Sequence, residues 1–119
     1  MGTQSYKQQP FTSVSAGATQ TSSWIDTAEI KYASFHVVWS GVTGTGGVRD
    51  ATIQVQVAND ASDSTNPVDK ANAQLTINTA TGSDLISISG VATENFYRVR
   101  LEPGNVTAGT VNCYALFKD

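Results

Sequence analysis

The chain has 119 residues, a charged fraction of 14% and a formal net charge of −3 at pH 7. This length favours one domain with its own core, because it lies well above the size at which disulfides or metals become necessary. Few Lys and Arg in an acidic chain exclude the basic face that nucleic-acid binding requires. No apolar run approaches the ~20 residues of a membrane span, and the N-terminus lacks the apolar segment of a secretory signal.

The first 22 residues are predicted to form an extended N-terminal arm and linker, ahead of a β-sandwich domain at residues 23–119. Residues 1–10 are polar and have no periodicity, which is typical of a segment that orders only against a partner. Short strands are predicted at Phe11–Ala16 and Ser23–Thr27.

The strongest pattern lies between Tyr32 and Ala58, where two alternating stretches flank a glycine-rich segment. Every second position is apolar in both stretches, as a half-buried strand requires, because successive Cβ atoms point to opposite faces of a sheet. These positions are Ala33, Phe35, Val37 and Trp39, then Ala51, Ile53, Val55 and Val57. The glycines allow positive φ, so the sequence predicts a hairpin with a loop over Gly41–Gly47.

Further strands are predicted after this hairpin. A cluster of Asn, Asp, Ser and Pro first predicts a long surface loop at residues 59–70. Alternation then recurs at Ala73–Asn78, Asp84–Ser89, Phe96–Leu101 and Val111–Phe117. About eight short strands separated by turns predict an all-β, antiparallel β-sandwich. The pattern leaves Greek-key, jelly-roll and meander connections open.

Two strands supply candidate contacts to a partner. Phe96, Arg98 and Arg100 share one face of their strand, and guanidinium groups can bind a carboxylate or stack on a ring. The last strand is apolar on both faces, with Tyr114 and Leu116 on the outward face. Such a strand is either covered on both sides or exposes apolar area for a contact. We therefore name Phe96, Arg98, Arg100, Tyr114 and Leu116 as candidate interface or glycan contacts.

No constellation favours an enzyme, a cofactor or a metal site. His36 is the only histidine and Cys113 the only cysteine, so the two cannot complete a zinc site. We expect His36 on the polar face of its strand and Cys113 in the core, apart from each other. Asp60, Asp63 and Asp69 could attract Ca²⁺, but their spacing does not match an EF-hand loop.

Four segments resemble the strands of small β-sandwich structural proteins of tailed bacteriophages. The segments are Ser34–Gly41, Thr52–Asp60, Phe96–Leu101 and Gly109–Tyr114. The group includes capsid decoration proteins, head fibres and tail accessory proteins, and its cores are similar to discoidin-like, carbohydrate-binding sandwiches. One departure is Ala58, where Ser is usual before Asn59 and Asp60. None of the shared motifs is catalytic.

The resemblance implies a non-enzymatic virion protein, in the first place a capsid decoration or cement protein, or another surface accessory. Such a protein would bind the particle through its N-terminal arm and an apolar sheet edge. The implied partners are the major capsid protein or other virion proteins and further copies of the chain, without nucleic acid or membrane. The implied location is the capsid surface or tail, after synthesis in the host cytoplasm. The alternative is a carbohydrate-binding β-sandwich module that recognises a host glycan. Under either function we expect the sandwich to be jelly-roll or discoidin-like.

Overall fold

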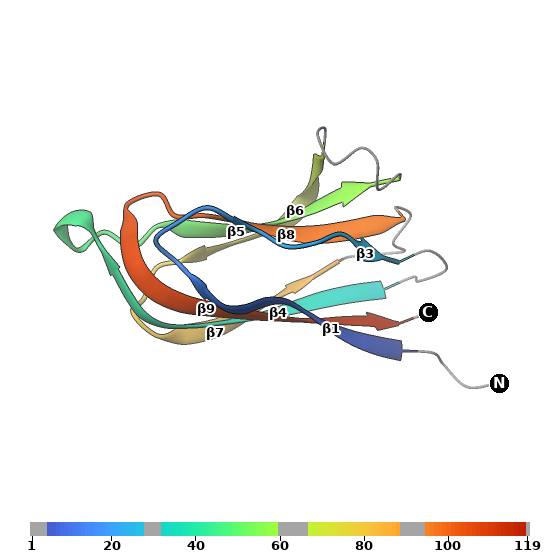
Figure 1. The fold of residues 1–119 in the computed structure, drawn as a ribbon, viewed down its shortest axis with the longest axis horizontal. Coiled ribbons are helices and arrows are strands. Elements are labelled where there is room, and N and C mark those ends of the chain that lie inside the picture. The colour runs from blue at the N-terminus through green and yellow to red at the C-terminus, as the bar shows by residue number, and fades with distance from the viewer. Residues whose placement is uncertain (1–4, 28–31, 60–66, 89–94, 119) are drawn as a thin grey trace.

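The computed structural model describes residues 5–27, 32–59, 67–88 and 95–118 as a sandwich of two antiparallel sheets (Figure 1). Sheet A contains, in order, β1 (Ser5–Ser15), β9 (Val106–Lys118), β4 (Tyr32–Gly44) and β7 (Gly82–Ser87). Sheet B contains β2 (Gln20–Thr21), β8 (Phe96–Glu102), β5 (Ala51–Ala58) and β6 (Val68–Ile77), and β3 (Ile25–Asp26) also pairs with β8. The predicted all-β sandwich is confirmed.

The chain passes back and forth between the sheets as it runs from β1 to β9. β1, β4, β7 and β9 lie in sheet A, whereas β2, β3, β5, β6 and β8 lie in sheet B. β2 and β3 pair with successive parts of β8, so they act as one interrupted strand. The resulting order is that of a jelly roll, a double sheet of eight strand positions. In the described ranges the one helical element is the 3₁₀ turn η1 (Thr45–Gly47), and no helix is long and apolar enough to cross a membrane.

The predicted hairpin between β4 and β5 is wrong. β4 pairs with β7 and β9 in sheet A, while β5 pairs with β6 and β8 in sheet B. Two strands that face each other across a core show the same alternation as two neighbours in one sheet, so the pattern could not separate these cases. The glycine-rich connection instead crosses between the sheets through η1, where Gly46 and Gly47 have φ of 63° and 79°.

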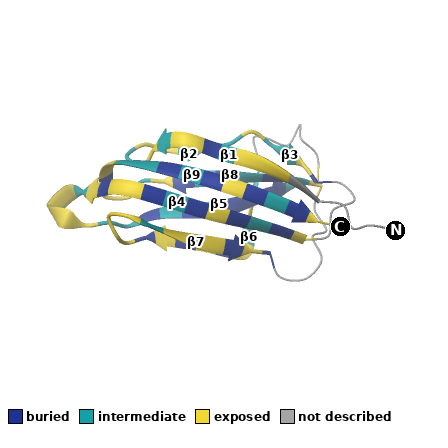
Figure 2. Cartoon of the chain, turned by 90° about the horizontal axis from the view of Figure 1, so that it is seen from below, coloured by how far each residue is buried: buried dark blue, intermediate teal, exposed yellow. Residues whose placement is uncertain are grey.

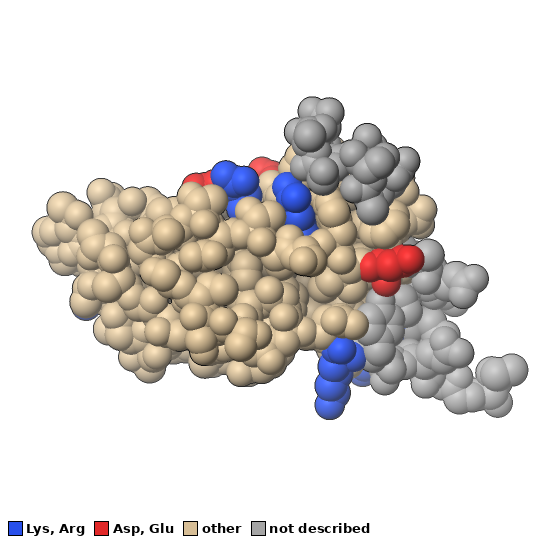
Figure 3. Space-filling model, viewed as in Figure 1, with Lys and Arg blue, Asp and Glu red and all other residues tan. Residues whose placement is uncertain are grey.

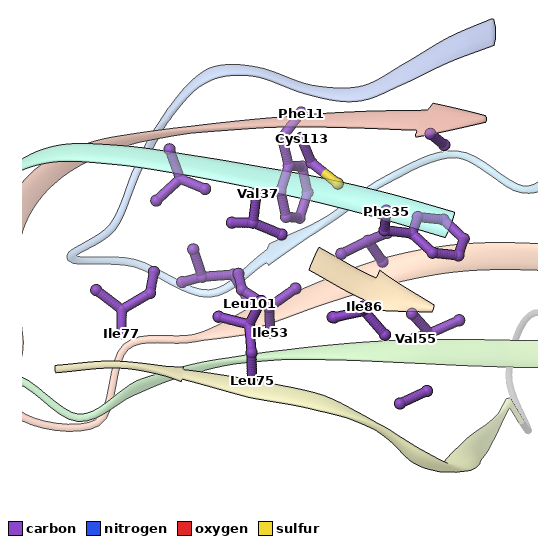
Figure 4. Packing of buried hydrophobic residues seen from close by; sticks show 14 of the residues in the cluster. Phe11, Phe35, Val37, Ile53, Val55, Leu75, Ile77, Ile86, Leu101 and Cys113 are labelled. Carbon is purple, nitrogen blue, oxygen red and sulfur yellow. The ribbon is translucent and has the colours of Figure 1, made fainter. Parts of the chain in front are cut away.

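The core lies between the sheets and takes side chains from both (Figure 4). The inward residues Phe35, Val37 and Cys113 of sheet A and Ile53 and Leu101 of sheet B are fully buried. Burial of each large apolar side chain contributes about 2–3 kcal/mol. Buried and exposed positions alternate along the strands, which appears as bands in Figure 2. The inward residues predicted for β4 and β5 are all confirmed.

The segment predicted as a separate arm, residues 1–22, belongs to the sandwich wherever it is described. β1 pairs with β9 along its length, and β2 pairs with β8. Phe11 and Ala16 are buried in the core. The polar sequence misled the prediction because β1 is an edge strand with register shifts on both sides of Phe11, which break its alternation. Residues 1–4 lie outside the described residues.

The predicted loop at residues 59–70 is shorter than expected, and a tight turn precedes the last strand. β6 begins at Val68, so Asp69 lies on a strand and not in the loop predicted at 59–70; residues 60–66 lie outside the described part. β9 begins at Val106, directly after a turn at Gly104. Asp50 fixes this turn, because its carboxylate accepts hydrogen bonds from the backbone N–H and the side-chain amide of Asn105.

Candidate interaction surfaces

The structure divides the five candidate contact residues between opposite faces of the sandwich. Phe96, Arg98 and Arg100 lie on β8 in sheet B, whereas Tyr114 and Leu116 lie on β9 in sheet A. We call the outward side chains of each sheet the sheet A face and the sheet B face. One flat contact therefore cannot include all five residues.

A polar row crosses three strands on the sheet B face. Nε of Arg98 donates to Oε1 of Gln56 at 2.9 Å, and Nε2 of Gln56 donates to Oδ1 of Asp69 at 2.9 Å. The guanidinium of Arg98 also lies 4.5 Å from the centre of the Trp24 ring, in a cation–π contact. Burial and the neighbouring Arg100 lower the pKa of Arg98, although an arginine stays charged in proteins.

Arg100 is also engaged within the chain. Its Nε donates to Oε1 of Glu102 at 2.6 Å, and the hydroxyl of Thr19 lies 3.4 Å from the other carboxylate oxygen. A carboxylate of a partner would have to compete with these internal bonds. New ion pairs to these arginines would therefore contribute less to binding at the sheet B face. Sequence reasoning missed Trp24, Gln56 and Asp69, because only the strand register brings them to Arg98.

A second row crosses the sheet A face and combines three different side chains. His36 of β4 lies opposite Tyr114 of β9 on one side and opposite Leu85 of β7 on the other. The rings of His36 and Tyr114 are tilted, with centroids 6.4 Å apart. Tyr114 is 46% exposed and Leu85 is 59% exposed. Exposed aromatic and aliphatic side chains that gather in one place usually mark a contact.

A groove of about 640 Å³ runs over this row. All four strands of sheet A contribute to it, among others through Lys7 of β1, Ser34 and His36 of β4, Leu85 of β7, and Tyr114 and Leu116 of β9. A smaller hollow of about 230 Å³ adjoins the groove, shares Ser34 and Leu116 with it, and adds Tyr32 and Lys118. The sheet A face is thus one continuous, partly apolar surface.

Four polar side chains of this surface, two in the central row and two beside it, have no hydrogen-bond or ion-pair partner in the described part of the chain. Within the described ranges, the side chains of Lys7, His36, Tyr114 and Lys118 make no hydrogen bond or ion pair. Sequence reasoning found Tyr114 and Leu116 and placed His36 correctly on the exposed face. It missed Leu85 and Lys7, because the row across the sheet depends on pairing partners that alternation does not encode.

Catalytic and metal chemistry find no support in the described residues. Cys113 faces the core and His36 faces solvent, so the two lie on opposite sides of sheet A. Burial raises the pKa of the Cys113 thiol to about 12. No group of three His, Cys, Asp or Glu that could hold a metal ion occurs in the described ranges. Asp60 and Asp63 fall outside those ranges, and Asp69 is bonded to Gln56.

No protein-family model matches the chain, and no curated protein matches it in sequence. Solved structures share its fold. The SPBc2 prophage-derived protein YomS is similar with a TM-score of 0.55 and 9% identity, over 100% of this chain and 96% of that chain. A chain of the capsid of Ralstonia phage GP4 is similar with a TM-score of 0.57 and 10% identity, over 98% of this chain and 83% of that chain. At these identities the likeness establishes a common fold.

Proposed function

We propose that the chain is a non-enzymatic structural protein of a bacteriophage particle. The observation that carries this proposal is the likeness of fold to a chain of the Ralstonia phage GP4 capsid, which extends over 98% of this chain and 83% of that one. The likeness to a prophage-derived protein adds support. The jelly roll itself recurs in viral capsid proteins.

The particular role we propose is that of a capsid decoration or cement protein, or another surface accessory. Its partner would be the major capsid protein or another virion protein, with further copies of the chain around it. A sandwich with a filled core is a rigid block, and particle symmetry repeats the same contact at each copy. A modest contact per copy is therefore sufficient where several are engaged at once.

The described part of the predicted N-terminal arm is built into the sandwich, so we propose attachment through the outer faces instead. Residues 5–15 form β1, and Phe11 and Ala16 are part of the core. Deletion of residues 1–20 would therefore damage the fold, so it cannot separate attachment from folding. Attachment is better tested on side chains of the outer faces, which can be changed without disturbing the core.

The first test is the composition of purified particles. Particles of the phage that carries the gene are purified through a density gradient, and their proteins are identified and counted by mass spectrometry. We expect the chain at a constant ratio to the major capsid protein across the particle peak. Its absence from the particles, together with its presence in the soluble lysate, would contradict the proposal.

A second candidate function is carbohydrate binding, which the groove on the sheet A face favours. Tyr114 offers an exposed ring there, and Gln8, Gln9 and His36 offer hydrogen-bonding groups beside it. Jelly rolls also occur in lectin domains. In this case Tyr114→Ala should weaken binding to an array of bacterial oligosaccharides without lowering the melting temperature. Absence of binding by the unchanged protein would count against this candidate.

A further inference from the structure

The edges of sheet A are shaped against pairing with another strand. In β1, Pro10 has no N–H to donate, and the register with β9 shifts on both sides of Phe11. In β7, the backbone N–H of Leu85 donates to the carboxylate of Asp84 at 2.8 Å, so this donor is already occupied. Bulges, Pro and charged side chains are the devices by which edge strands avoid aggregation.

The edges of sheet B are interrupted as well. β6 contains Asn72 with φ of 59°, and the amide of Gln54 fills the resulting irregularity by donating to the carbonyls of Lys70 and Ala73. The opposite edge consists of β2 and β3, each of two residues. Attachment through a sheet edge, which the sequence suggested, therefore has little support. The outer faces of the two sheets are the better candidates for a contact with a partner.

The sheet A face carries a charge opposite to that of the whole chain. Lys7 and Lys118 flank it, although the net charge of the chain is −3. Asp84 is the one Asp or Glu in the four strands of sheet A, and its carboxylate accepts a hydrogen bond from the backbone N–H of Leu85. In Figure 3 the lower side, which belongs to sheet A, shows Lys or Arg atoms but no Asp or Glu atoms among the described residues.

We propose that the sheet A face is the docking surface of this protein and that its occupant is a particle protein which offers carboxylates around an apolar patch. This inference rests on the proposed function. Lys7 and Lys118 would pair with the carboxylates, since neither has a partner in the described part of the chain. Tyr114, Leu85 and Leu116 would pack on the apolar patch. The arginines of the sheet B face are already engaged.

A protein surface fits this face better than a saccharide. Leu85 is 59% exposed at the end of the central row, and its side chain can neither donate nor accept a hydrogen bond. Among the described residues that line the groove there is no Asp or Glu to accept hydrogen bonds from sugar hydroxyls. Apolar side chains surrounded by polar ones are the usual anatomy of a protein–protein contact.

The experiment uses particles that lack this protein. Particles produced by a phage with the gene deleted are mixed with the purified full-length chain, and the bound fraction is measured by co-sedimentation. The variants are Leu85→Asp and the double change Lys7→Glu with Lys118→Glu. The control is Thr76→Asp, because Thr76 is also exposed and lies on β6, an edge strand of sheet B. Thermal unfolding checks that every variant is folded.

We expect each sheet A variant to weaken attachment by about tenfold or more. Leu85→Asp disturbs a central contact residue, and the double change reverses both flanking charges so that they repel the partner's carboxylates. The control should bind like the unchanged protein. Raising NaCl from about 0.05 M to about 0.5 M should weaken attachment of the unchanged protein and have less effect on the double variant, because salt screens exposed charges.

Four results would overturn the inference, each in a recognisable way. Sheet A variants that attach normally would place the contact elsewhere and leave the proposed function intact. If the free protein formed a dimer that Leu85→Asp dissociates, the occupant of the face would be a second copy of the chain. If Leu85→Asp abolished binding to an oligosaccharide array while attachment persisted, the occupant would be a saccharide. An unchanged protein that does not attach at all would remove the proposed function itself.

Discussion

At the scale of single residues, burial decides the chemistry of Cys113. The side chain is fully buried among inward residues of sheet A, and burial raises its pKa from 9.0 to about 12 because the thiolate would lose its hydration. The reactive form of a cysteine is the thiolate. Cys113 is therefore a small core residue, as the sequence predicted, and not a nucleophile.

The raised pKa has a consequence for stability at high pH. Between about pH 9 and pH 12 the unfolded chain loses the thiol proton while the folded chain keeps it. The unfolded state then binds fewer protons, so the free energy of unfolding falls as pH rises, by up to about 1.4 kcal/mol per pH unit. Denaturant titrations from pH 8 to pH 11 in about unit steps should show this slope.

The control for this prediction is Cys113→Ala. The variant should be less stable at pH 8, because it leaves a small cavity. Its free energy of unfolding should nevertheless fall less steeply between pH 9 and pH 11, since tyrosines and lysines titrate alike in both proteins. Parallel curves would show that the thiol does not set the slope.

At the scale of elements, the close approach of β4 and β9 depends on Gly109. This residue has φ of 131°, and a Cβ placed there would lie 2.8 Å from the Cα of Val42. Backbone atoms cannot move aside as a flexible side chain can. We expect Gly109→Ala to lower the free energy of unfolding by about 2–4 kcal/mol, through strain and displaced pairing.

Gly41 is a matched control on β4. Its φ is 63°, but a Cβ there would meet nothing within 4 Å. Gly41→Ala should cost only about 1–2 kcal/mol, the usual penalty for a left-handed residue. Chemical denaturation of both variants measures the difference. Equal losses would mean that conformation alone, and not the contact with Val42, requires glycine at position 109.

Alternation predicted the faces of the strands but not their neighbours. It placed Phe35 and Ile53 on the buried face correctly, and it gave Phe96–Leu101 for a strand that runs from Phe96 to Glu102. It could not show that β4 and β5 lie in different sheets, because the period of two is the same in both arrangements. For the same reason, alternation could not show that the five candidate contact residues lie on two opposite faces of the sandwich. The row of Tyr114, His36 and Leu85 exists only through pairings between β9, β4 and β7.

At the scale of the whole molecule, the first strand is a structural part of the sandwich. β1 covers one edge of β9, and it delivers Phe11 to the core from the opposite end of the sequence (Figure 1). The backbone N–H of Ala16 also donates to the carbonyl of Gly109 at 2.9 Å, which fixes the exit from β1. A domain that began after residue 22 would lack β1, so the edge of β9 and the part of the core that Phe11 fills would be exposed to water.

We therefore expect a chain that lacks residues 1–16 to lose cooperative folding. Loss of Phe11 alone removes about 2–3 kcal/mol of burial, and the pairing with β9 is lost with it. Domains have only about 5–15 kcal/mol of stability, so these losses are a large share of the total. A chain that lacks residues 1–4 keeps all of β1 and serves as the control. Circular dichroism during heating should show a sharp transition for the control, and none or a much lower one for the longer deletion. If both chains melted together, residues 17–119 would fold without β1, and residues 1–16 would again be available as an attachment arm.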